Sequence, residues 1–260
     1  MYIMTNNMHF VIAHYKEDLS WTKKLNLDYT YTIIDDGCMY KISVKDHGFD
    51  PERYKIIEGD HSPQEASKYL TYIIDNYDQL PDRICFTQGD PIYHSPDFIQ
   101  LVNNYELHEP MQPLTLFAHP SNWGPDQSIR ENNIISLNGG KIWVQEMKDD
   151  LSPKFWKDFF LGHLYAIFDK LHYPNNNQTI VSTFLKDFNI PYNTPYRLFY
   201  AACFSVSRDK ILAHPKETYI KLRDFVYCKN LNLKYDYHNH FTPKMAAVML
   251  EMLWGVIFGL

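Results

Sequence analysis

The sequence predicts an α/β fold in which helices flank one mostly parallel central sheet. Strand and helix signals alternate through the first half of the chain, which is typical of parallel sheets. The chain of 260 residues is long enough for one large core, and neither an internal repeat nor a low-complexity linker divides it. We therefore expect residues 1–260 to form a single domain.

The first sixty residues contain three strand signals. Met8–His14, Tyr29–Ile34 and Tyr54–Ile57 are segments of strand length that are rich in apolar, aromatic and β-branched residues. A short helix is expected at Glu17–Leu25, and Asp35-Asp36-Gly37 has the composition of a turn. This alternation favours parallel pairing of the strands.

The best-defined helix signal starts at Ser62. Ser62 and Glu65 have the spacing of a capping box, with Pro63 at the first helical position. Apolar residues then recur at helical spacing as far as Tyr77. The capping box accounts for Glu65, so we assign this residue to helix formation and not to catalysis.

The next predicted strand, Arg83–Thr87, leads directly into the polar turn Gln88-Gly89-Asp90-Pro91. Ligands of open α/β sheets bind beyond the carboxyl ends of strands, so this turn is a candidate binding site. His94 follows closely, and a carboxylate with an imidazole could bind Mg, Mn or Zn, which makes Asp90 a candidate metal ligand. An ordinary Asp-Pro turn is the alternative.

The segment His14-Tyr15-Lys16-Glu17-Asp18 occupies the corresponding place after the first strand. A nucleotide base or ribose could dock there. The alternative is a solvated helix start, where the helix dipole favours acids. Asp35-Asp36 and the pair His238 and His240 are weaker candidates, because a turn explains the first and no third ligand accompanies the second.

The second half of the chain mixes further strand and helix signals. Strands are predicted at Leu114–His119, Asn133–Leu137 and Phe199–Val206, and helices at Pro153–Leu171, at Arg208–Ala213, from Pro215 onward and from Thr242-Pro243 to the C-terminus.

Composition excludes some classes of function. The net charge of −6 argues against non-specific nucleic-acid binding, which needs clustered cations. The cysteines Cys38, Cys85, Cys203 and Cys228 form no C-x-x-C pair, so reduced and mostly buried thiols are expected in place of a zinc or redox site. Residues 1–14 lack the pattern of a signal peptide. We therefore expect a cytoplasmic protein.

The most apolar stretch of the chain, Met245–Leu260, contains a single carboxylate side chain, that of Glu251. The stretch is shorter than the roughly 18 apolar residues of a membrane span and carries a charge near its middle, so no span is expected. On a helix, the small residues Ala247 and Gly255 flank Glu251, and no Lys, Arg or His lies one turn away. A carboxylate in such surroundings has a tertiary partner or a raised pKa, as general bases do. The alternative is that Glu251 has no catalytic role and lies on the solvent-exposed edge of a mostly buried helix.

Three blocks of the sequence resemble a domain family of unknown function from fungal, algal and large-virus proteins. They are Glu65–Pro81 with Phe86–Pro91 and His94, Phe204–Leu212 with Pro215 and Tyr219, and Leu250–Gly259; the opening Val11–Trp21 fits as well. The chlorella-virus-type members of that family have glycosyltransferase-A-like features. Where the family often has His after the Gly of the strand-end turn, this chain has Asp90, which departs from the pattern.

The second and third blocks are also similar, more loosely, to mucin-type branching glycosyltransferases of glycosyltransferase-A fold. Ser207-Arg208 corresponds to their Leu-Ser-Arg segment, and Glu251 with Trp254 to a helix whose Glu is the catalytic base. The acidic residue that precedes this Glu is replaced by Leu250 here. Those enzymes work without a metal and use cationic side chains on the diphosphate, a role that the resemblance offers to Arg208.

Together these observations lead to the hypothesis of an inverting glycosyltransferase on a glycosyltransferase-A-like scaffold. It would use a nucleotide sugar, UDP-linked by preference, and a glycan acceptor, with Glu251 as general base and a divalent ion (Mn or Mg) at Asp90 as an option. A viral member would act in the host cytoplasm. The predicted donor-binding residues are His14, Tyr15, Glu17, Asp18, Gln88, Gly89, Asp90, His94 and Arg208. The alternatives are a metal-dependent hydrolase around Asp90 and His94, and a non-catalytic glycan-binding module.

Overall fold

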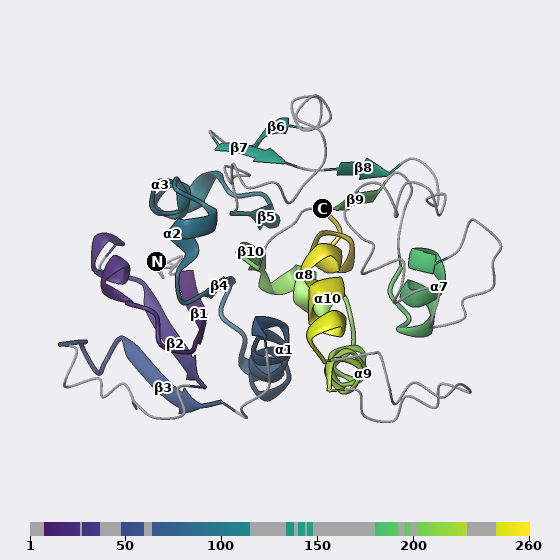
Figure 1. Ribbon diagram of the computed structural model, residues 1–260, viewed down its shortest axis with the longest axis horizontal. Helices are drawn as coiled ribbons and strands as arrows, with labels where there is room; N and C mark the ends of the chain where they lie inside the picture. Colours follow the sequence, from purple (N-terminus) through teal and green to yellow (C-terminus); the bar gives the residue numbers. More distant parts are fainter. Residues whose placement is uncertain are drawn as a thin grey trace, which may run out of the picture.

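A six-stranded sheet forms the centre of the computed structural model, with the strand order β3-β2-β1-β4-β10-β5 (Figure 1). Its strands are β1 (Met8–His14), β2 (Thr30–Asp35), β3 (Tyr54–Glu58), β4 (Arg83–Gln88), β5 (Met111–Pro113) and β10 (Phe204–Ser207). The structure describes residues 8–26, 28–36, 48–59, 64–114, 134–137, 140–143, 145–147, 180–191, 196–198, 202–227 and 243–260.

The strands β1 to β4 run in one direction. β1 pairs in parallel with β2 and β4, and β2 pairs in parallel with β3, which confirms the predicted mostly parallel α/β sheet. β10 runs antiparallel to both of its neighbours, β4 and β5. The four parallel strands therefore end together at one side of the sheet, here called the carboxyl edge, whereas β10 ends at the opposite side, the amino edge.

Helices cover both faces of this sheet. The helices and turns are η1 (Ser20–Lys24), α1 (Glu65–Asn76), η2 (Tyr77–Gln79), α2 (Pro91–His94), α3 (Phe98–Asn103), η3 (Tyr105–Leu107), α7 (Ile180–Asp187), α8 (Arg208–Leu212), α9 (Lys216–Val226) and α10 (Pro243–Ile257). Two small antiparallel pairs complete the described elements: β6 (Ile134–Leu137) with β7 (Gly140–Trp143), and β8 (Gln145–Met147) with β9 (Tyr196–Leu198).

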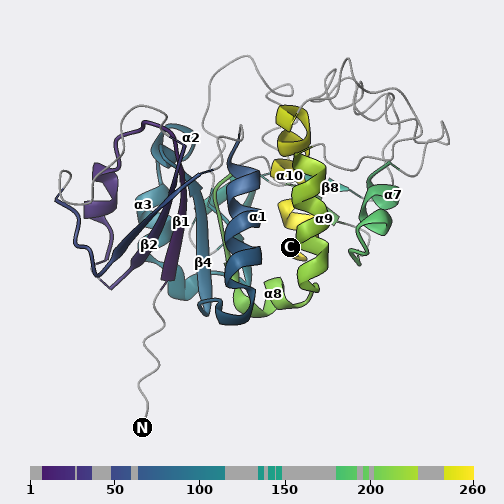
Figure 2. The ribbon, with the colours of Figure 1, turned by 90° about the horizontal axis from the view of Figure 1, so that it is seen from below.

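Successive side chains of β1 point to opposite faces of the sheet, so this strand contributes to a hydrophobic core on each face. Val11 packs in the core formed with α1, α9 and α10, whereas Phe10 and Ile12 pack in a second core with η1 and α3. Figure 1 shows these two sets of helices on opposite sides of the sheet, and Figure 2 shows α1, α9 and α10 standing side by side. Full burial of each large apolar side chain contributes about 1.5–3 kcal/mol to stability.

Two predictions about local structure are wrong. The predicted helix at residues 17–25 is present only as the shorter 3₁₀ helix η1; Asp18, just before it, uses its carboxylate to accept the Ser20 backbone N–H, a local contact that competes with a longer helix. The best-defined helix starts later than predicted: α1 begins at Glu65, and Gln64 occupies the N-cap without a side-chain cap. Ser62 and Pro63 lie outside the described residues.

The predictions for the second half of the chain are confirmed in part. β6 confirms the predicted strand at Asn133–Leu137 to within a residue, and α8, α9 and α10 confirm three predicted helices. The predicted strand at Phe199–Val206 is shorter, since β10 starts at Phe204. Residues 115–119 and the predicted helix Pro153–Leu171 lie outside the described residues, as do Cys38 and Cys228. Cys85 and Cys203 are buried and free, as predicted.

In the described part of the chain, no helix is both long enough and apolar enough to cross a bilayer, α10 included.

Candidate functional site

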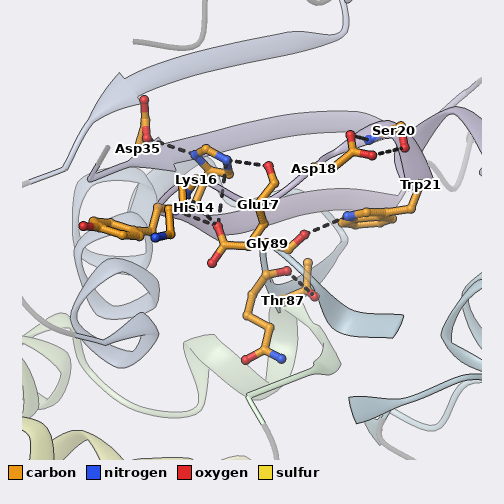
Figure 3. A network of polar contacts seen from close by, with 11 residues as sticks. His14, Lys16, Glu17, Asp18, Ser20, Trp21, Asp35, Thr87 and Gly89 are labelled. Carbon is orange, nitrogen blue, oxygen red and sulfur yellow. Dashed lines mark hydrogen bonds and ion pairs between the residues drawn. The ribbon is translucent and has the colours of Figure 1, made fainter. Parts of the chain in front are cut away.

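His14 connects two loops at the carboxyl edge. It is the last residue of β1, and its buried ring lies with Nδ1 at 2.9 Å from Asp35 Oδ1 and Nε2 at 2.9 Å from the Glu17 carbonyl oxygen. Figure 3 shows this chain of contacts running from Asp35 through His14 to Glu17. Both ring nitrogens face acceptors, so the ring makes both contacts as donor only when each nitrogen carries a proton. The contacts fix the start of the loop after β1.

Glu17 holds the same loop from the other side. Its carboxylate accepts the backbone N–H groups of Tyr15 (2.8 Å) and Lys16 (3.0 Å). It also lies so close to Gly89 that a Cβ at position 89 would come 2.7 Å from Glu17 Cδ. Trp21 Nε1 donates to the Gly89 carbonyl oxygen at 2.8 Å (Figure 3). The loops after β1 and β4 are therefore joined, and a side chain at position 89 would have to displace the Glu17 carboxylate.

The turn after β4 uses its polar side chains internally. Gln88 Nε2 donates to the Asp90 carbonyl oxygen at 3.1 Å, and Asp90 Oδ1 accepts the Tyr93 backbone N–H at 3.4 Å as the N-cap of α2. The side chain of His94 lies outside the described parts. Among the residues that the structure describes, no group of three or more His, Cys, Asp or Glu side chains is arranged to hold a metal ion.

The N-terminus of α1 brings a second set of charges to the same edge. Gln64 has φ +94° and ψ 151°, a conformation that costs a non-glycine residue about 1–3 kcal/mol. Its carbonyl oxygen accepts Lys68 Nζ at 3.2 Å. Lys68 also forms a buried ion pair with Asp36, which follows β2. Strained backbone that a buried ion pair supports is typical of functional sites.

Glu251 lies in the middle of α10 and is half-buried. Burial raises the pKa of its carboxyl group well above the ordinary 4.5, and the nearby Glu65 carboxylate raises it further. Burial also raises the pKa of Glu65; its own backbone N–H and the Lys68 ammonium oppose this rise, and the Glu17 carboxylate adds to it. Glu17, Glu65 and Glu251 thus form one group of interacting carboxylates, here called the glutamate cluster.

Arg208 is not part of this arrangement. Because β10 runs antiparallel to β4, Ser207 pairs with Arg83 at the amino edge, and the Arg208 backbone N–H donates to the Asp82 carbonyl oxygen there. The Arg208 guanidinium pairs with the Asp82 carboxylate at 2.9 Å, and both side chains are about half exposed. The structure thus places Arg208 at the opposite edge of the sheet from the other predicted donor-binding residues.

The carboxyl edge gathers most of the predicted site residues. The loops after β1 and β4 bring together His14, Tyr15, Glu17, Asp18, Gln88, Gly89 and Asp90, and Glu251 reaches them through Glu65. Sequence reasoning missed Glu65, which it assigned to capping, and Lys68. Their spacing of one helical turn just after a strand was the available signal.

Comparison with known families concerns the part of the chain that builds this edge. Residues 10–137 match, and belong to, a family described as "Protein of unknown function (DUF3431)". The matched residues include the loops after β1, β2 and β4 and the start of α1, but not Glu251. No curated protein matches the chain. Membership of a family of unknown function is thereby established for residues 10–137, and no named relative supports the glycosyltransferase resemblance.

Proposed function

We propose that this protein is an inverting glycosyltransferase that moves a sugar from a nucleotide-sugar donor to a glycan hydroxyl, with Glu251 as general base. One observation carries the proposal: Glu251 has a raised pKa and belongs to the glutamate cluster at the carboxyl edge. Ligands of open α/β sheets bind at that edge, and a base is most effective when its pKa lies near the working pH.

The proposed reaction needs one proton transfer to the protein. Glu251 takes the proton of the acceptor hydroxyl while that oxygen forms a bond to the anomeric carbon. The bond from the anomeric carbon to the diphosphate breaks on the opposite face, so the configuration inverts and the nucleoside diphosphate leaves with the bonding pair. General-base assistance of this kind contributes about 10²- to 10⁴-fold to the rate.

The donor, with UDP as the expected nucleotide, would lie across the loops after β1 and β4. His14 and Glu17 are occupied in holding these loops, so they support the site and do not line it. Tyr15, Asp18 and Asp90 are exposed and Gln88 is partly exposed, which leaves these four to face the donor. Direct contact is thus proposed for fewer residues than the sequence suggested.

The leaving diphosphate requires positive charge, and Arg208 is too far away to supply it. Lys16 is exposed in the loop after β1, with its ammonium 5.4 Å from the centre of the Tyr15 ring, and is the cation that we propose for this role. Mg²⁺ is commonly bound by one or two carboxylates together with substrate phosphates. Asp90 would fit a divalent ion in that shared form, because no group of three or more candidate ligands exists among the described residues.

The first test needs no knowledge of the sugar. Thermal unfolding is measured with UDP, GDP, CMP, UDP-glucose, UDP-galactose and UDP-N-acetylglucosamine, because a ligand that binds the folded state raises its stability. A transferase is stabilised by its donor nucleotide. Absence of any shift across the nucleotides would contradict the proposal.

The second test addresses Glu251 directly. Glu251→Gln should bind the stabilising nucleotide sugar as the unchanged protein does, while transfer falls by about 100-fold or more. Glu106→Gln, an exposed neutralisation in η3, is the matched control and should leave transfer unchanged. Near-normal turnover of Glu251→Gln would show that another group is the base.

A glycan-binding module is the second candidate, and exposed aromatic rings favour it. Tyr15, in the loop after β1, and Tyr93, in α2 after β4, are 48% and 62% exposed. Such rings can stack on sugars. Binding to glycans without any stabilisation by nucleotides would select this alternative. No described cluster of ligands favours the metal-dependent hydrolase, and His238 and His240 lie outside the described residues.

A further inference from the structure

We propose that Glu65 and Glu251 act as one acid pair that shares a single proton, and that Glu65 sets the pH range in which Glu251 can accept a proton. The catalytic half of this inference rests on the proposed function. The pairing itself does not, and it can be measured without any substrate.

The helices that carry the two residues run in the same direction. α1 starts beside the carboxyl edge, and its C-terminal end reaches the amino edge, where Tyr77 donates to the His214 carbonyl oxygen. The C-terminal end of α10 reaches the same place, because Ile257 accepts a hydrogen bond from the His214 ring and Gly259 accepts one from Lys210. Figure 2 shows α1 and α10 side by side in this orientation.

The packing of α1 against α10 places the Glu65 and Glu251 carboxyl groups at a similar height along the two helices. Tyr69, one turn after Glu65, and Trp254, one turn after Glu251, have ring centroids 6.4 Å apart. Side chains on a helix lean toward its N-terminus, so both carboxyl groups lie on the carboxyl-edge side of this ring contact. Two acids from helices far apart in the sequence therefore lie on the same side of one pair of buried rings.

The surroundings make the pair asymmetric. Glu65 has two neighbours that favour its ionised form, its own backbone N–H and the Lys68 ammonium. Lys68 is shared with Asp36, so it neutralises Glu65 only in part. Among the side chains that the structure describes, the titratable groups that interact with Glu251 are Glu65, Tyr69 and Cys203, and none of these three is a cation. Glu65 is therefore the first of the two to ionise, and the proton remains on Glu251.

This asymmetry has a consequence for catalysis. Glu251 becomes a free base only when it loses its proton beside a Glu65 that is already charged, which makes it a stronger base than a lone carboxylate. The proton that it takes from the acceptor hydroxyl can then pass through the partly exposed edge to solvent. Glu65 touches no reacting atom in this scheme and is a positioning residue.

The test that needs no substrate is a double-mutant cycle in which stability is measured as a function of pH. The free energy of unfolding is followed from about pH 4 to pH 9 for the unchanged protein, Glu65→Gln, Glu251→Gln and the double variant. A shared proton predicts that the two single changes are not additive: with Glu65 neutral, the pKa of Glu251 in the folded state should fall by about one unit or more. Additive pH profiles would overturn the pairing. Glu65→Gln retains an acceptor for the helix N-terminus; if it fails to fold, Glu65→Asp, with a shorter reach, serves in the same cycle.

The catalytic test uses the donor selected by the nucleotide panel. The acid limb of kcat/KM against pH should move to lower pH by about one unit or more in Glu65→Gln. Asp75→Asn, an exposed change at the far end of α1, is the control and should leave the limb in place. A uniform loss of rate with an unmoved limb would mean a purely structural role. Non-additive unfolding without any transferase activity would keep the pair and reject the proposed function.

Discussion

Glu17 and Gly89 are in direct contact, with the Glu17 carboxylate filling the space that a side chain at position 89 would need. The contact joins the loop after β1 to the turn after β4. It is tightened by the two backbone N–H groups that hold the carboxylate and by the hydrogen bond from Trp21 to the Gly89 carbonyl oxygen. The shape of the candidate site therefore depends on the absence of a Cβ at this position.

Gly89→Ala should destabilise the protein by about 1–3 kcal/mol, because the added methyl group displaces a carboxylate that cannot move without losing its hydrogen bonds. Urea unfolding measures the effect. The control is Glu17→Ala with and without Gly89→Ala: removal of the carboxylate should reduce the cost of the methyl group. Equal costs in both backgrounds would show that the contact does not limit position 89.

The parallel half of the sheet was predictable from sequence because its strands alternate with helix and turn signals. β1 was predicted residue for residue, and β2, β3 and β4 to within one residue at each end. The direction of β10 was not predictable, because the apolar pattern of a strand does not show whether it pairs in parallel or antiparallel with its neighbours. That direction moves Arg208 to the amino edge.

Glu65 and Glu251 illustrate what the sequence could and could not predict about the site. The apolar surroundings of Glu251 indicated a raised pKa, and the structure agrees. Its partner Glu65 was hidden, because a capping-box pattern offered a complete local explanation for that residue. The actual start of α1 depends on the backbone conformation of Gln64, which residue spacing does not reveal.

A buried ion pair and a half-exposed ion pair should contribute differently to the stability of the protein. Asp36 and Lys68 form a buried pair, whereas Asp82 and Arg208 form one with about half of each side chain exposed. Asp36→Asn removes the ion-pair partner of the buried Lys68 ammonium and should lower the free energy of unfolding by about 3–5 kcal/mol. Asp82→Asn, the matched control, should lower it by less than about 1 kcal/mol. Similar losses in urea unfolding would mean that Lys68 is solvated.

Acid should destabilise the protein through two histidines. Burial lowers the pKa of both His9 and His108 from 6.5 to about 4, with the Lys55 ammonium adding to the effect on His9 and the Arg83 guanidinium to that on His108. Between these values the unfolded chain binds protons that the folded state does not. Stability is therefore fully present above pH 6.5 and is lost as the pH falls toward about 4.

Replacement of either histidine by Gln removes this proton uptake. The difference in unfolding free energy between about pH 7.5 and pH 4.5 should be smaller in His9→Gln and in His108→Gln than in the unchanged protein. Unfolding in urea at several pH values provides the measurement. Curves that run parallel to that of the unchanged protein would indicate that the acid sensitivity has another origin.

Glu251 should have the opposite effect on stability. Its pKa is raised by burial and by the Glu65 carboxylate, so above the unfolded value of 4.5 the folded state binds a proton more tightly than the unfolded chain does. The stabilisation that this proton provides is complete below pH 4.5 and is lost as the pH rises through the raised pKa. Glu251→Gln resembles the protonated form at every pH. It should match the unchanged protein in unfolding free energy at about pH 4 and exceed it at about pH 8, at the same time as it loses transfer. A variant less stable than the unchanged protein at both pH values would mean that the Glu251 carboxylate is held by a compensating cation, and this would remove the physical basis for its role as a base.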